Sequence, residues 1–349
     1  MALKNLRGFV SPIAILLGII IAGIVPGLNG GKADLILGEF VVYFMWITLA
    51  EGWNMVGGYA GLLNLGFVAF FGVGGIVCSL AFFAGLSIVA GMLIAGVAGA
   101  LMALALIPTF RLRSEYFAIG TLVIPVIVKP LVEYFTNSES FAVPVSHVLN
   151  RVQFYYLGLG MSAVAIFGTF FLMRTRIGIA LRAMGDDEVA ASSLGVNVLL
   201  YKTVALVVSG FIAAVAGAYY LQFIGSVSTT IFQDLTYSLF PIFMVIIGGS
   251  GTFEGPLIGA LIFSVIDYYS PTIFANSTAD TLVFSIIIMA VAVLLPRGII
   301  PTLRRRLHRR KAESQVKPPA APPLTTTRTT TPRTTGALST DSASASDRN

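Results

Sequence analysis

The chain consists mainly of long apolar runs that are separated by short polar segments. A run of about 20 apolar residues is long enough to cross the hydrocarbon core of a bilayer as a helix. We count roughly ten such runs, near 9–28, 36–56, 62–84, 86–109, 115–135, 154–173, 203–224, 236–249, 256–270 and 281–296. The eighth and ninth runs are short and flanked by glycine, which also suits a re-entrant or broken helix. The pattern therefore predicts an all-α polytopic membrane protein with about ten transmembrane helices.

Composition supports this prediction. Hydrophobic residues make up 56% of the 349 residues and charged residues only 11%, with a mean hydropathy of +0.88. A soluble globular protein has roughly 25% charged residues. The 36 glycines suit a helix bundle in lipid, because small residues let helix backbones approach closely. A soluble globular fold is thereby excluded.

The placement of Lys and Arg predicts the orientation, because cytoplasmic loops of membrane proteins are enriched in these residues. With a cytoplasmic N-terminus and ten spans, the opposite loops contain only Lys32 and Arg151. The cytoplasmic side then contains Lys4, Arg7, Arg111, Arg113, Arg174, Arg176, Arg182, Lys202, Arg297 and the basic residues of 304–311. We therefore expect both termini in the cytoplasm, with the first run kept as an uncleaved helix.

The polar segments predict how the chain is divided. Residues 1–303 form the transmembrane domain, whose longest cytoplasmic loop spans 174–202. The basic cluster 304–311 follows, and either contacts anionic lipid headgroups or only fixes the topology. Residues 312–349 are rich in Pro, Thr, Ser and Ala, with almost nothing apolar to bury, and are expected to be disordered.

The sequence contains no motif for catalysis. The only two histidines, His147 and His308, are far apart, and the single Cys78 lies in an apolar run. HExxH, GxSxG and the nucleotide-binding GxxxxGK[ST] are absent from the sequence. We expect neither an enzyme nor a cofactor or metal site. The net charge of +6 does not indicate nucleic-acid binding, because the basic residues lie at membrane edges.

The loop 174–202 is predicted to contain two short helices. Ile177, Leu181 and Met184 share one face of the first helix, while Arg174, Gly178 and Arg182 share the other. Gly185 interrupts this helix. Asp186 can then cap a second helix whose first turn holds Asp187 and Glu188, and Gly195 ends it.

The second helix is slim, since it contains Ala190, Ala191, Ser192 and Ser193. A helix this short is marginal in water, so it needs a partner surface. Its small side chains would fit a cleft on another protein. The alternative is an ordinary capped connector between two membrane helices.

Four ordered stretches resemble one protein family. They are "GGYAGLLNLGFVAFFGVGG" (57–75), "RLRSEYFAIGTL" (111–122), "RTRIGIALRAMGDDEVAASSLGVNVLLYK" (174–202) and "MVIIGGSGTFEGPLIGA" (244–260). Together they resemble the ABC importer permeases for branched-chain, or hydrophobic, amino acids, and the M-type more than the H-type subunit. The chain departs from the family pattern at Asn64 and Phe67, where many members have serine and histidine.

This resemblance implies a function for the short cytoplasmic helix. In the family it corresponds to the coupling helix, which lies in a cleft of the ATPase subunit. By resemblance, Asp186, Asp187, Glu188, Ala190, Ala191 and Gly195 would form the ATPase-coupling element. The implied partners are an H-type permease, two ABC ATPase subunits and an extracytoplasmic solute-binding protein, in a bacterial or archaeal cytoplasmic membrane. The cargo would be a branched-chain or hydrophobic amino acid or a related small polar solute.

Glycine-broken segments and ionisable residues at membrane depth are the candidates for the substrate pathway. They comprise Glu51, Asn54, Gly58, Gly61, Asn64, Gly249 and Gly251. Each glycine alone also fits a tight interhelical turn. Lys129 and Glu133, four residues apart, are expected to pair with each other.

The competing interpretation is a self-sufficient secondary transporter or channel. Such a carrier would need no docking helix and would usually place ion-coupling carboxylates at mid-membrane. Glu51 alone fits that requirement poorly.

Overall fold

A computed structural model describes residues 18, 33–111, 114–142, 149–274 and 298–302 of the chain. Its longer helices are α2 (Ala33–Trp53), α3 (Phe67–Phe83), α4 (Ile88–Ala105), α5 (Ser114–Thr136), α6 (Arg151–Leu172), α9 (Val198–Ile224), α10 (Thr236–Gly248) and α11 (Gly255–Phe274). Shorter elements are the π-helix η1 (Asn54–Tyr59), the 3₁₀-helices η2 (Ile107–Arg111) and η4 (Thr229–Gln233), α7 (Arg176–Asp186), α8 (Glu188–Ser193), and strands β1 (Ser140–Ala142) and β2 (Ser226–Ser228).

The second to ninth apolar runs each coincide with a helix, which confirms the helical class. Within the described ranges, four helices are long and apolar enough to cross a membrane: Ile88–Ala105, Tyr116–Thr136, Arg151–Leu172 and Val198–Ile224. The eighth run forms only the 13 residues of α10. The runs 9–28 and 281–296, the basic cluster 304–311 and the tail 312–349 lie outside the described residues.

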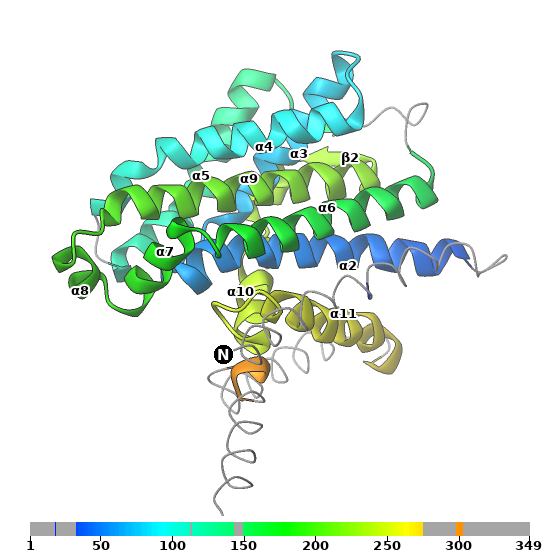
Figure 1. The fold of residues 1–349 in the computed structure, drawn as a ribbon. Helices are drawn as coiled ribbons and strands as arrows, with labels where there is room; N and C mark the ends of the chain where they lie inside the picture. The colour runs from blue at the N-terminus through cyan, green and yellow to red at the C-terminus, as the bar shows by residue number, and fades with distance from the viewer. Residues whose placement is uncertain (1–17, 19–32, 112–113, 143–148, 275–297, 303–349) are drawn as a thin grey trace, which may run out of the picture. The chain divides into compact units, whose positions relative to one another are not determined.

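Helices α2 and α9 form the centre of the bundle (Figure 1). Helix α9 packs against α3 and α4, while α2 packs against α6, α9, α10 and α11. Glycines allow the closest of these contacts, because a side chain at Gly74 would collide with the backbone of Ala214 and one at Gly217 with that of Phe71. Close backbone approach is the usual mode of helix packing in lipid.

Two features of the backbone differ from the sequence prediction. The third helix begins at Phe67 rather than near residue 62, because Gly61 adopts φ +70° and the side chain of Asn64 accepts a hydrogen bond from the Gly66 amide. Residues 60–66 therefore form a non-helical segment. The second feature is a short antiparallel sheet that the sequence did not predict, in which β1 and β2 pair with Phe141 opposite Val227.

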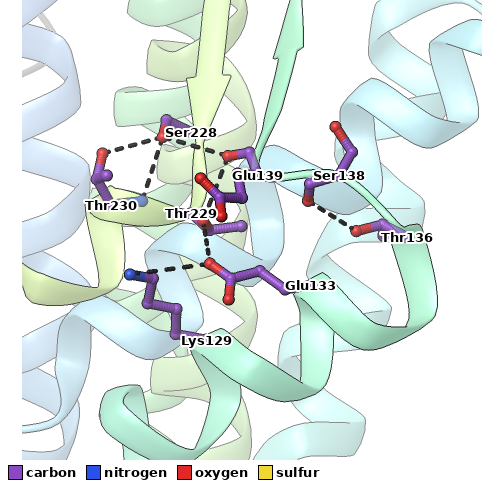
Figure 2. Close-up of polar contacts among 8 residues, drawn as sticks. All are labelled: Lys129, Glu133, Thr136, Ser138, Glu139, Ser228, Thr229 and Thr230. Atoms are coloured by element: carbon purple, nitrogen blue, oxygen red, sulfur yellow. Dashed lines mark hydrogen bonds and ion pairs between the residues drawn. The ribbon is translucent and has the colours of Figure 1, made fainter.

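This sheet joins the C-terminal end of α5 to the connection between α9 and α10 (Figure 2). The Thr229 hydroxyl donates to a carboxylate oxygen of Glu133 at 2.6 Å, and the Thr229 amide donates to the Glu139 carbonyl at 2.9 Å. The predicted pairing of Lys129 with Glu133 is confirmed at 3.8 Å. Thr229 thereby ties η4 to α5.

Candidate functional site

The α7–α8 segment (residues 176–195) contains the two short helices expected in the loop 174–202. Helix α7 buries Leu181 and Met184 and leaves Arg182 exposed, as its amphipathic pattern predicts. Gly178, predicted to lie on the polar face, is buried where a side chain would collide with the Met173 backbone. The predicted break at Gly185 is wrong, since α7 continues to Asp186.

Gly185 stays helical despite the cost of roughly 1 kcal/mol for glycine in a helix. A side chain at this position would collide with the carbonyl oxygen of Tyr59, so only glycine permits the contact. The helix cap consequently moves by one residue. Asp187, not Asp186, caps α8, and one of its carboxylate oxygens accepts from the amides of Val189 and Ala190, both at 2.9 Å.

The end of α8 agrees with the sequence. Gly195 adopts φ +85°, its amide donates to the Ser192 carbonyl at 3.0 Å, and the Val196 amide donates to the Ala191 carbonyl at 3.1 Å. These two bonds form a Schellman motif, which satisfies the last helical carbonyls. Helix α8 is therefore defined at both ends although it has only six residues.

The two faces of α8 are unlike. Ala191 is 2% exposed and faces the rest of the protein, whereas Val189 and Leu194 are 75% and 85% exposed. Val189 and Leu194 are therefore exposed on α8, whereas Ala191 is covered by the rest of the chain.

Glu188 forms an ion pair that the sequence did not reveal. Its carboxylate lies 2.6 Å from the ammonium of Lys202 on α9. Lys202 is only 7% exposed, while about half of the Glu188 side chain remains accessible. The one available signal is a lysine directly before the apolar run 203–224, a position that orientation alone also explains. The pair fixes the first turn of α8 to a membrane helix.

Glu51, the deepest predicted pathway residue, is fully buried in α2. One carboxylate oxygen lies 3.2 Å from the Thr169 hydroxyl on α6, and the other has no hydrogen-bond partner among the described residues. A buried carboxyl in a membrane helix is costly, and Glu51 stays a predicted pathway residue.

Asn54 lies one turn further along and contacts the second glycine motif directly. Its carboxamide accepts from the Gly251 amide at 3.0 Å and donates to the Thr252 carbonyl at 2.9 Å. Gly58 lies beside this contact, and a side chain there would come within 2.7 Å of the Gly251 nitrogen. The two glycine motifs, about 190 residues apart in sequence, therefore meet in space.

The remaining predicted pathway residues shape the backbone around this contact. Gly249 and Gly251 adopt φ +125° and +69°, and Gly61 lies beside Gly185 of α7. Asn64 accepts at its backbone carbonyl from the Trp53 indole nitrogen at 2.9 Å. In the described residues, no three His, Cys, Asp or Glu side chains are grouped so that they could hold a metal ion.

The structure thus brings most of the predicted site residues to one end of the bundle. Asn54, Gly58, Gly249 and Gly251 lie together, and Gly61 connects them to the α7–α8 segment. Glu51 lies near them on α2 but contacts Thr169 instead.

Comparison with known proteins identifies the family. Residues 35–293 match the family described as "Branched-chain amino acid transport system / permease component". Similar proteins include the probable branched-chain amino acid transport permease protein LivM of Methanocaldococcus jannaschii, 23% identical over 62% of this chain and 68% of the relative. LivM of Escherichia coli K12 is 27% identical over 75% of this chain and 69% of its own.

A permease of the other type is also similar, over a shorter region. The high-affinity branched-chain amino acid transport system permease protein LivH of Salmonella typhimurium is 29% identical over 47% of this chain and 51% of the relative. The family match covers most of the described helices and all the candidate site residues. This chain therefore belongs to the family of branched-chain amino acid transport system permease components.

Proposed function

We propose that this chain is a membrane subunit of an ATP-driven ABC importer. In this proposal it moves branched-chain or hydrophobic amino acids, or a related small polar solute, into the cell. The observation that carries it is the α7–α8 segment. A six-residue helix has a defined cap at each end, an ion pair to α9 and two exposed apolar side chains.

Such a helix suits a partner's cleft. At 1.5 Å per residue it is about 9 Å long, too short to be stable in isolation. The Asp187 cap, the Schellman motif and the Glu188–Lys202 pair hold it in place before a partner binds. Val189 and Leu194 then supply apolar area for an ATPase subunit, on which ATP hydrolysis would take place.

The proposed assembly contains an H-type permease, two ATPase subunits and an extracytoplasmic solute-binding protein. The similarity to both LivM and LivH supports a pair of permeases. The basic residues support a cytoplasmic α7–α8 segment and cytoplasmic termini, in a bacterial or archaeal cell membrane.

Reconstitution in proteoliposomes tests this function. The chain alone is expected to hydrolyse no ATP and to accumulate no labelled leucine. With its partner permease, ATPases and binding protein, uptake should depend on ATP. Accumulation by the chain alone under a proton or sodium gradient would instead identify a secondary transporter.

The docking surface can be tested separately. Val189→Asp and Leu194→Asp each place a charge on the exposed face of α8, so both should lose copurification with the ATPase subunits. Thr230→Asp is the matched control, because Thr230 is an exposed residue of η4, on the connection at the far end of α9. Normal ATPase binding by both α8 variants would refute the docking assignment.

A further inference from the structure

We infer that Asn54 is a positioning residue that links the α7–α8 segment to the loop of residues 249–254. The connecting part is the η1 segment (residues 54–61), which contacts both. The inference rests on the proposed function, since it assigns the route by which a displacement of α8 would reach the predicted substrate pathway.

The contact between the η1 segment and the loop is made by a side-chain amide and two backbone groups. Asn54 is fully buried, and both its oxygen and its nitrogen are used, toward Gly251 and Thr252. A carboxamide that bonds backbone groups of two consecutive residues fixes both their distance and their orientation. Asn54 therefore holds the loop rather than merely filling space beside it.

The loop is braced internally, so it should move as a unit. The Thr252 hydroxyl donates to the Gly249 carbonyl at 2.7 Å and accepts from the Gly255 amide at 3.1 Å. Gly255 is the first residue of α11. A shift of Asn54 would accordingly reach the start of α11.

The contact between the η1 segment and α7 consists mainly of backbone. A side chain at Gly185 would collide with the Tyr59 carbonyl oxygen, and one at Gly61 would lie 3.4 Å from the Gly185 Cα. The Arg182 guanidinium lies over the Tyr59 ring, 5.7 Å from its centroid. Backbone in direct contact has no rotamer that could absorb a small shift, so motion at one side displaces the other.

The geometry of the η1 segment also argues for a functional constraint. Single π-helical turns are rare in proteins, and those that occur are often found at functional sites. Here the π-helix places Asn54 and Gly58 together beside Gly251, while the Leu62 amide closes the segment on the Val56 carbonyl at 2.9 Å. The segment is thus a defined connector between the two glycine contacts.

Hydrogen exchange tests the link without requiring transport. The probe is the exchange rate of the 249–255 peptide in the detergent-purified chain, which contains the Gly251 amide bonded to Asn54. Gly185→Ala pushes α7 away from Tyr59 at a distance from this loop, and should accelerate its exchange about fivefold or more. Gly168→Ala is the matched control, because a side chain at Gly168 would meet nothing within 4 Å. Unchanged exchange in Gly185→Ala would overturn the inference.

The effect of the Asn54 contact on transport is measured in the reconstituted importer as uptake per ATP hydrolysed. Wild-type uptake that does not depend on ATP would refute the proposed function and leave the exchange result to decide the link. In an active importer, Asn54→Ala should hydrolyse ATP normally but lower uptake per ATP about fivefold or more.

A purely structural role would instead reduce hydrolysis and uptake in the same proportion, which would contradict the inference. If Asn54→Ala fails to assemble, Asn54→Asp replaces it in the same assay. Aspartate keeps the acceptor for Gly251 but places a carboxylate oxygen against the Thr252 carbonyl. Unchanged uptake per ATP in this variant would also overturn the inference.

Discussion

Lys202 illustrates how a single residue can define a short element. Its ammonium lies almost buried at the start of an apolar helix, where an unpaired charge is costly. Glu188 compensates this charge from the first turn of α8, where the helix dipole also favours an acid. Glu188 is thus an anchor of α8 within the chain, whatever it contacts in an assembly.

A charge swap tests this anchor. Glu188→Lys and Lys202→Glu each leave two like charges together, at a cost between about 1 kcal/mol for an exposed pair and about 3 kcal/mol for a buried one. Each single variant should therefore lose most ATP-driven uptake. The double variant Glu188→Lys/Lys202→Glu should recover it, as measured in the same proteoliposomes. Equal loss in the double variant would assign Glu188 to a partner instead.

At the scale of elements, the apolar pattern predicted helix existence well and irregular backbone poorly. The run 36–56 became α2 plus part of η1, but no periodicity distinguishes a π-turn from an α-turn over six residues. The three-residue strands β1 and β2 are too short to show alternation. The cap shifted from Asp186 to Asp187 because a tertiary contact at Gly185 kept α7 helical.

The tie between η4 and α5 gives a prediction at this scale. Thr229→Val removes the hydroxyl that donates to Glu133 and leaves this partly buried carboxylate with Lys129 alone. A hydrogen bond to a charged group contributes about 1.5–3 kcal/mol, so its loss should lower the temperature of thermal unfolding in detergent. Thr230→Val, which removes only an exposed contact with Ser228, should unfold like the wild type. Equal unfolding temperatures for Thr229→Val and the wild type would show that the tie between η4 and α5 contributes no stability.

For the whole molecule, the distribution of Lys and Arg along the chain predicts the orientation in the membrane. Helix α9 alone separates the α7–α8 segment from the sheet and η4, and it is long enough to span a bilayer. The two ends of the described bundle should therefore face opposite sides of the membrane. The basic residues around 174–202 then favour a cytoplasmic α8.

Cysteine labelling in intact cells tests this orientation. Ser192 and Thr230 are both exposed, and the native Cys78 is buried, so its background labelling should be low. An impermeant maleimide added outside should label Thr230→Cys and not Ser192→Cys. The reverse pattern, or labelling of both, would contradict the predicted topology.

The π-helix has a consequence for the length of the chain. A π-turn holds more residues than the α-turn that it replaces, and each residue in an α-helix rotates the next by about 100°. Deleting one residue between Trp53 and Gly58 would turn Gly58 away from Gly251 although Gly58 itself is kept. Open connections such as the turn at Gly85, where a side chain would meet nothing within 4 Å, have no such requirement. Among related permeases, insertions and deletions should therefore be found around Gly85 and be absent from residues 54–60.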